Sequence, residues 1–206
     1  MGRIDTPTKA TLRIATKVRK SLLATANAAH DKAGASNAQI AIPMSAGVDS
    51  HCALFTQLAL GHNPKVFSFH LKGTLSRDFL IAKRTAAEFG LDFVEVVLPN
   101  DVDTLIADVK ALGELGARSK TDFECFWPMH YLLPRIKKAG CKLLFTGHGA
   151  DSLFCMSRKA TQHYKGREDE FRDMAFSNKH AFQRHLIDAT CSELGLTYSP
   201  IFYTKT

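Results

Sequence analysis

The chain has 206 residues, of which 45% are apolar and 23% are charged, as in a globular protein with one sizeable core. No run approaches eighteen apolar residues and no apolar segment follows Met1, so neither a membrane span nor a secretory signal is predicted and a cytoplasmic protein is expected. Five scattered cysteines exclude a zinc ribbon or a disulfide framework, and the net charge of +7 suits a polyanionic partner or a nucleotide.

The first predicted element is a long helix from Thr8 to about Ala33, ended by the turn at 34–37. Its apolar residues recur at three- and four-residue spacing: Leu12, Ala15, Val18, Leu22 and Ala26. A second face carries a basic stripe, formed by Lys9, Arg13, Lys17 and Lys20. Two interpretations stay open: the solvated face of a packed helix, and a docking surface for RNA or a protein partner.

The next stretch combines a short apolar strand, Ile40 to Met44, with a small-residue turn and a helix start. Small side chains in the turn Ser45-Ala46-Gly47 let backbone N–H groups approach an anion, and the helix start adds unpaired N–H donors. Ser45 supplies a hydroxyl, and Asp49 has the chemistry to hold Mg²⁺ beside phosphate oxygens. The alternative is an ordinary turn in which Asp49 and Ser50 cap the helix.

Strands and helices then alternate, which predicts one doubly wound α/β domain with a parallel sheet and helices on both faces. The predicted strands are 65–70, 92–98 and 141–146. The predicted helices run from Ser76 to Gly90, from Asn100 or Asp101 to Gly113, and from Pro128 onward, after a loop at 116–125 and with a kink at Pro134. Residues 1–206 are expected to form a single domain, with 1–36 as an N-terminal helix packed on it and 156–206 as a basic lid and C-terminal segment.

A second glycine loop, Gly147-His148-Gly149-Ala150-Asp151, follows the strand at 141–146 directly. Ligands in open α/β sheets bind beyond the carboxyl ends of the strands, where the strand order reverses. If the first and fourth strands are neighbours, the two loops face each other and Asp49 and Asp151 converge as a magnesium site. The alternative for Asp151 is a helix cap after a glycine turn.

These motifs carry a family resemblance. The sequence Ser-Ala-Gly-Val-Asp-Ser at 45–50 resembles the pyrophosphate loop, Ser-Gly-Gly-x-Asp-Ser, of the N-type ATP pyrophosphatases, with Ala46 in place of one Gly. With the strand at 67–69, the segment 128–137 and the loop at 147–154, the chain resembles the synthetase domain of glutamine-dependent asparagine synthetases and their β-lactam-synthetase relatives. The resemblance implies an adenine nucleotide alpha hydrolase-like fold of the HUP type.

The resemblance also implies an activity and a set of site residues. In that family ATP and Mg²⁺ activate a carboxylate as an acyl adenylate, pyrophosphate leaves, and a nitrogen nucleophile attacks. By position, the expected ATP-binding residues are Met44, Ser45, Ala46, Gly47, Val48, Asp49, Ser50, Phe69, Gly147 and Gly149. Asp49 and Asp151 are the expected metal ligands. Lys179 is the first candidate for a lysine that stabilises the transition state, ahead of Lys159 and Lys165, and a solvated surface lysine is the alternative.

Two departures from the family, and one aromatic side chain near them, bear on the substrate. His148 stands where the family has Glu, and a base, a phosphate-binding cation and a space-filling side chain stay open as its role. Glu124 stands where the family has Arg, which is expected to disfavour aspartate and favour a cationic or neutral substrate. Trp127 is expected either to line that substrate pocket or to pack in the core.

Partners follow from the same resemblance. No Cys follows the initiator Met, so the resemblance implies that ammonia, another amine or a separate subunit supplies the nucleophile to a small-molecule substrate. Nucleic acid is a less favoured partner, and a homo-oligomer stays open. Two alternative functions are a tRNA- or nucleobase-modifying enzyme of the same loop class and an ATP-binding regulatory subunit without turnover. The basic segment between Met156 and Arg184 is interpreted as a lid over ATP or, alternatively, a nucleic-acid contact.

Overall fold

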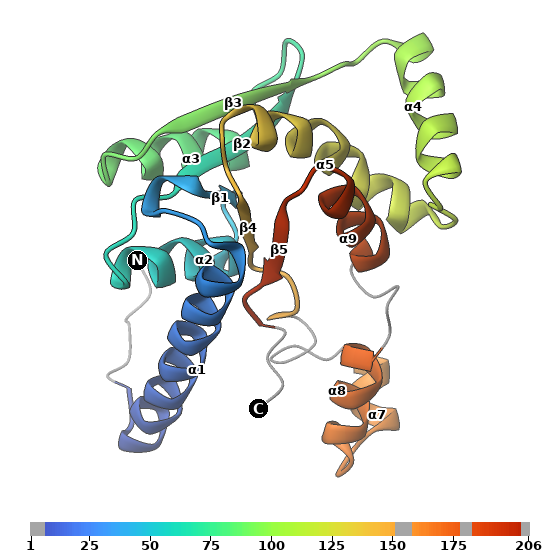
Figure 1. The fold of residues 1–206 in the computed structure, drawn as a ribbon. Coiled ribbons are helices and arrows are strands. Elements are labelled where there is room, and N and C mark those ends of the chain that lie inside the picture. Colours follow the sequence, from blue (N-terminus) through green and yellow to red (C-terminus); the bar gives the residue numbers. More distant parts are fainter. Residues whose placement is uncertain (1–6, 151–157, 178–182, 203–206) are drawn as a thin grey trace.

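The computed structural model describes residues 7–150, 158–177 and 183–202 (Figure 1). Within them the strands form one five-stranded parallel sheet in the order β3-β2-β1-β4-β5. The strands are β1 (Ile40–Pro43), β2 (Lys65–Leu71), β3 (Phe93–Leu98), β4 (Leu143–Thr146) and β5 (Thr197–Pro200). The predicted α/β fold with a doubly wound parallel sheet, of the HUP-like kind, is therefore confirmed.

Helices cover both faces of this sheet (Figure 1). The covering helices are α1 (Lys9–Ala33), α2 (Val48–Ala59), α3 (Arg77–Glu88), α4 (Val102–Glu114), α5 (Lys120–Lys138) and α9 (Arg184–Glu193), with a short 3₁₀ turn η1 (Asn37–Gln39) before β1. Two further helices, α7 (Arg158–His163) and α8 (Glu168–Ser177), lie apart from the sheet (Figure 1). None of the helices in the described part of the chain is both long and apolar enough to span a bilayer.

The strands bury both faces because successive side chains point to opposite sides of a sheet. In β1, Ile40 and Ile42 join the core under α1, α2 and α3, whereas Ala41 joins the core under α4, α5 and α9. In β4, Phe145 joins the core under α1, α2 and α3, and Leu144 joins the core under α4, α5 and α9. Near-continuous apolar strands are the expected consequence of a sheet covered on both sides.

The chain reverses its direction across the sheet between β1 and β4. It runs outward from β1 through β2 to β3, then returns to place β4 on the other side of β1, with Ile40 paired to Leu143 and Ala41 to Leu144. The expectation that the first and fourth strands are neighbours is confirmed. The segments that follow these two strands therefore meet at the carboxyl edge of the sheet.

One helix boundary and one strand differ from the sequence prediction. The helix expected to start near Pro128 begins at Lys120, because Ser119 and Asp122 form a capping box in which Ser119 Oγ accepts from the Asp122 N–H at 3.1 Å and Asp122 Oδ2 accepts from the Ser119 N–H at 2.9 Å. Residues 120–125, predicted as loop, are thus helical. The strand β5 was not predicted, since Thr-Tyr-Ser-Pro has no apolar alternation and pairs only through tertiary contact with β4.

The helix predicted at the N-terminal end is present, whereas the segment predicted as a basic lid contains helices and ion pairs. The helix α1 starts after Thr8, whose Oγ1 accepts from the Thr11 N–H, and ends at Gly34 in the left-handed conformation. In the segment predicted as a basic lid, Arg167 pairs with Glu170 and Arg172 pairs with Asp169. The division of the chain into one domain with these two appended segments stays a prediction.

A buried carboxylate links α4 to α5 through two hydrogen bonds. Asp108 is 9% exposed, and its Oδ2 accepts from Trp127 Nε1 and from Tyr131 Oη, each at 2.7 Å. Burial, and then the neighbouring Asp108 charge, raises the pKa of Tyr131 to about 12, so the phenol stays a donor. The indole of Trp127 is thereby held against α4.

We expect Asp108→Ala to lower the free energy of unfolding by about 3 kcal/mol, because it leaves two partly buried donors without an acceptor. Asp108→Asn keeps one acceptor oxygen and should cost less. Urea unfolding followed by tryptophan fluorescence measures both. The matched control is Asp103→Ala on the exposed side of the same helix, expected to cost less than about 1 kcal/mol. Equal losses for Asp103→Ala and Asp108→Ala would contradict the role given to Asp108.

Candidate functional site

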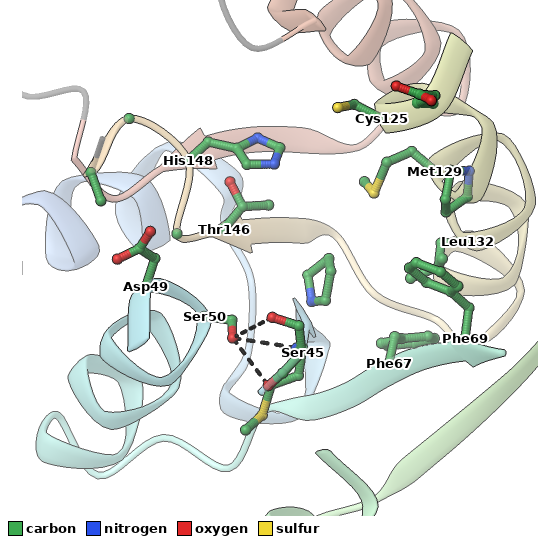
Figure 2. A pocket seen from close by; sticks show the side chains of 17 residues that line it. Ser45, Asp49, Ser50, Phe67, Phe69, Cys125, Met129, Leu132, Thr146 and His148 are labelled. Atoms are coloured by element: carbon green, nitrogen blue, oxygen red, sulfur yellow. Dashed lines mark hydrogen bonds between the residues drawn. The ribbon is translucent and has the colours of Figure 1, made fainter. Parts of the chain in front are cut away.

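A cavity of about 380 Å³ opens at the carboxyl edge of the sheet, between β1, β2, β4 and the first half of α5 (Figure 2). Four segments line it: the β1–α2 turn (Pro43, Met44, Ser45, Asp49, Ser50), β2 (Phe67, Phe69), α5 (Glu124, Cys125, Pro128, Met129, Leu132) and the end of β4 with its loop (Thr146, Gly147, His148, Gly149, Ala150). Both sequence motifs singled out as phosphate-binding loops therefore contribute to one cavity.

The β1–α2 turn is fixed by its own serines. Ser45 Oγ accepts from the Gly47 N–H at 3.1 Å, and Ser50 Oγ donates to the Gly47 carbonyl at 2.9 Å. The helix α2 then begins after Gly47, which has no side chain to cap it, and Ser50 Oγ bonds to the carbonyls of the turn. Its first-turn N–H groups have no intrahelical acceptor and are the donors that an anion would use.

The loop after β4 packs directly on the first turn of α2. A Cβ added to Gly147 would overlap the backbone carbonyl of Asp49 and lie 2.9 Å from the Ser50 nitrogen, a spacing that only glycine tolerates. Gly149 adopts φ 96°, also a conformation that favours glycine. These two glycines let the two loops meet and form a cradle that a side chain would fill.

The expected ATP-binding residues divide into two groups. Met44, Ser45, Asp49, Ser50, Phe69, Gly147 and Gly149 line the cavity. Ala46, Gly47 and Val48 belong to the turn but not to the cavity lining, and the Val48 side chain is 73% exposed. Their contribution at this turn would come from the backbone, because the turn presents its amide groups rather than these side chains.

Of the expected metal ligands, Asp49 lines the cavity beside the β4 loop (Figure 2), and Asp151 lies outside the described residues. Lys179, the candidate for transition-state stabilisation, also lies outside them. Among the described residues, no three His, Cys, Asp or Glu side chains gather closely enough to hold a metal ion alone. A single carboxylate beside a phosphate cradle fits Mg²⁺, which keeps water and takes substrate phosphates as ligands.

His148 lies across the cavity from Phe67 and Phe69 (Figure 2). Its Nδ1 is hydrogen-bonded to Tyr198 Oη of β5 at 2.8 Å, and desolvation lowers the pKa of His148 to about 4. Burial raises the pKa of Tyr198, so both groups are neutral at physiological pH. A phosphate-binding cation is therefore not the state of His148 near neutrality. Since Nδ1 is engaged, Nε2 is the ring nitrogen left for a substrate.

Tyr198 is a site residue that sequence reasoning missed. Its strand, β5, has no apolar alternation that predicts a strand, and Tyr198 follows His148 by 50 residues in the sequence. Only the pairing of β5 with β4 brings Tyr198 behind the cavity.

The remaining wall is mainly apolar. Phe69 is 39% exposed, and α5 contributes Cys125, Pro128, Met129 and Leu132 to the lining. Figure 2 shows Leu132 beside Phe69. Glu124 lies at this wall with 62% of its side chain exposed, 3.5 Å from Lys120 Nζ. Among the described lining residues, the ionisable side chains besides histidine are two acids and a thiol, and there is no lysine or arginine.

Trp127 is placed differently from Glu124. The indole is bonded to Asp108 and packs on the α4 side of the core, outside the cavity lining. Of the two roles expected for this side chain, packing is the one that the structure supports, because Trp127 and Glu124 are three residues apart on α5 and the Asp108 contact turns the indole toward α4.

Comparison with known proteins gives a family and a distant structural relative. A family model described as asparagine synthase matches residues 21–198. No curated protein sequence matches significantly. Among solved structures, the chain is similar to a predicted subunit of tRNA methyltransferase from Methanocaldococcus jannaschii, with 17% identity and a TM-score of 0.37. The similarity covers 64% of this chain and 64% of that one, less than two thirds of the relative's length.

We expect Gly147→Ala to lower the free energy of unfolding by more than about 2 kcal/mol, because the new methyl group meets backbone rather than a flexible side chain. Chemical denaturation measures the loss. Gly113→Ala is the matched control: nothing lies within 4 Å of a Cβ there, inside α4, and the change should stabilise by up to about 1 kcal/mol. A neutral Gly147→Ala would mean that the two loops are not in contact.

His148 should make stability depend on pH. Because its pKa is lowered, the unfolded state binds the proton more readily; this contribution is complete above pH 6.5 and is lost as the pH falls toward 4. The loss at pH 4.5 should be about 2 to 3 kcal/mol. Urea unfolding at pH 7 and pH 4.5 should show this loss in the wild type and a smaller one in His148→Gln. The same pH dependence in both proteins would contradict a neutral, partly buried His148.

Proposed function

The chain belongs to the asparagine synthase family, and we propose that it is an ATP-dependent ligase that forms AMP and pyrophosphate while activating a carbonyl of a small molecule for a nitrogen nucleophile. The observation that carries this proposal is the contact between the two glycine loops, in which the Gly147 backbone lies against Asp49. That contact gathers a phosphate cradle, a carboxylate and a histidine around one cavity.

The residues present fit a nucleotide with magnesium. The uncapped first turn of α2 and the serine-braced turn before it would hold the phosphates through backbone N–H groups. The described lining offers no lysine or arginine, so neutralisation of phosphate charge would fall to Mg²⁺ on Asp49, with Asp151 as its proposed second ligand. Lys179 stays the proposed cation for the transition state. Phe69 would supply the apolar surface beside the adenine.

The proposed reaction has two displacements. A substrate carboxylate or amide-type oxygen forms a bond to the α-phosphorus of ATP, and the bond from that phosphorus to the pyrophosphate oxygen breaks. A nitrogen nucleophile then forms a bond to the activated carbon, and AMP leaves with the original oxygen. The nitrogen must lose a proton in this second step, and the neutral His148 is the proposed acceptor, in the tautomer whose Nδ1–H donates to Tyr198 Oη and leaves Nε2 unprotonated.

Glu124 is the proposed determinant of the acceptor. Its carboxylate lies at the α5 wall with Cys125, Pro128 and Met129, and the described lining residues include no arginine or lysine that would attract a second carboxylate. A substrate with a cationic or neutral group at this end would be preferred over a dicarboxylate such as aspartate, because like charges repel in a partly desolvated site. This supports an activity related to that of the family with a different acceptor.

We expect ATP turnover to depend on Asp49. AMP and pyrophosphate release, measured with Mg²⁺ against amino acids, ammonia, other amines and bulk tRNA, should be stimulated by one acceptor and fall at least a hundredfold, about 3 kcal/mol of activation free energy, in Asp49→Asn. Asp103→Asn, far from the cavity on α4, is the control. Release stimulated only by tRNA would instead favour a nucleobase-modifying enzyme. ATP binding without release under every condition would favour a regulatory subunit or one that needs a partner.

Acceptor choice should depend on Glu124. In Glu124→Arg, kcat/KM for a cationic preferred acceptor should fall at least tenfold, because the charge at the α5 wall is reversed. For the same reason, kcat/KM for aspartate should rise. Glu124→Gln should lie between. The control is Lys120→Gln, which removes the partner of Glu124 without changing the cavity lining. Unchanged preference in Glu124→Arg would show that this side chain does not meet the acceptor.

A further inference from the structure

The N-terminal half of α1 projects beyond the sheet (Figure 1). A helix of 25 residues is about 37 Å long, whereas the strands that it contacts, β4 and β5, have four residues each and span about 13 Å. The sheet can cover only part of such a helix. Its buried residues, Ala26 and Ala29, are both near the C-terminal end, and every residue from 7 to 17 is exposed.

This projecting half carries one sign of charge. Lysine and arginine occur there at Lys9, Arg13, Lys17, Arg19 and Lys20, and the first acidic residue of the helix is Asp31. None of these five side chains makes an ion pair within the described part of the chain. In a protein with formal charge +7, five unpaired cations on one rigid segment are a concentrated positive surface.

Four of these cations face away from the core. Lys9, Arg13, Lys17 and Lys20, here called the basic stripe, repeat at three- and four-residue spacing and therefore share one face. Lys20 and Ala29 are nine residues apart, which is two and a half turns, so the stripe is opposite the buried face. The stripe is about 16 Å long, measured along the helix axis.

The charges are also placed against the preference of the helix itself. The N-terminal turn of a helix has a partial positive charge, which favours acidic side chains, yet the first turn of α1 has none and contains Lys9. A bound anion at this end would remove that unfavourable term. Basic residues near the N-terminus lower the stability of the isolated helix, and a bound polyanion would restore that stability.

We propose that the projecting half of α1 docks duplex DNA, with the basic stripe on the phosphates. A helix that is exposed all round and has a diameter of about 10 to 12 Å fits the B-DNA major groove, about 12 Å wide, whereas the major groove of duplex RNA is too narrow for it. A rigid row of cations also suits a stiff duplex, which has one negative charge per about 1.7 Å of axis.

A membrane surface is less well matched. The large apolar side chains that are most exposed here, Leu12 at 52% and Ile14 at 62%, are two residues apart and so lie about 200° from each other around the helix. They do not form the single apolar face that an interfacial helix buries in lipid.

The strands and α1 run in opposite directions, so the basic stripe projects from the same edge of the sheet as the cavity (Figure 1).

The proposal is tested by DNA binding of the full chain, measured by fluorescence anisotropy with a labelled 20-base-pair duplex and no ATP. Replacing Lys9, Arg13, Lys17 and Lys20 by Gln should weaken binding roughly a hundredfold at 50 mM salt and make the slope of log K against log salt shallower by about 3 to 4. The conservative set Lys9→Arg, Lys17→Arg and Lys20→Arg should retain affinity. Circular dichroism checks that α1 stays helical in both variants.

The matched control replaces Lys72, Lys110, Lys138 and Lys142 by Gln, four exposed lysines on other elements, so that both variants lose the same charge. It should weaken binding less than about fivefold. Equal losses in both variants would overturn the proposal, as would no DNA binding at 50 mM salt. Stripe-dependent binding that is tighter to duplex RNA, to phosphatidylserine vesicles or to polyglutamate would also overturn it. Because no assay uses ATP, the result is independent of the proposed ligase activity.

Discussion

The close approach of the Gly147 backbone to Asp49 is the constraint on which the site depends. It exists because β1 and β4 are parallel neighbours at the point where the chain reverses across the sheet. Each strand ends in a turn of small residues, and a side chain at Gly147 would force the turns apart. The N-terminus of α2, Asp49 and the β4 loop would then no longer border one cavity.

Around that contact the cavity combines a polar floor with an apolar wall. The floor offers backbone N–H groups and one described carboxylate, and the wall is formed by β2 and α5 side chains. His148 connects this cavity to the edge strand β5 through Tyr198, and its lowered pKa keeps the imidazole neutral. A neutral histidine is able to accept a proton, so its chemistry differs from that of a bound cation.

The periphery is held by fewer interactions than the sheet. The helix α4 is attached to α5 mainly through Asp108, which accepts from two aromatic side chains, and α1 extends past the short strands that support its C-terminal third. The length of α1 and its unpaired cations are features that packing against the sheet does not require. They are the reason for assigning this helix a role beyond support of the core.

The sequence by itself determined the class of fold and the location of both loops. Apolar runs of strand length alternating with amphipathic helices predict a doubly wound sheet, because local side-chain periodicity reflects which faces are buried. Small residues after the first and fourth strands identify the loops, because backbone that approaches a ligand or another turn closely excludes larger side chains. The predicted helix starts near Thr8, Ser76 and Asp101 are equally local, because each of these side chains caps its helix in the structure.

Tertiary structure alone decided the features that depend on distant residues. The strand β5 has no amphipathic pattern and exists through its pairing with β4, and only that pairing brings Tyr198 to His148. The hydrogen bond to Asp108 holds Trp127 away from the cavity, whereas Glu124, one turn earlier on α5, lines the cavity. These outcomes depend on which groups meet across the fold, and the free energy of such contacts is not encoded in the spacing of neighbours along the chain.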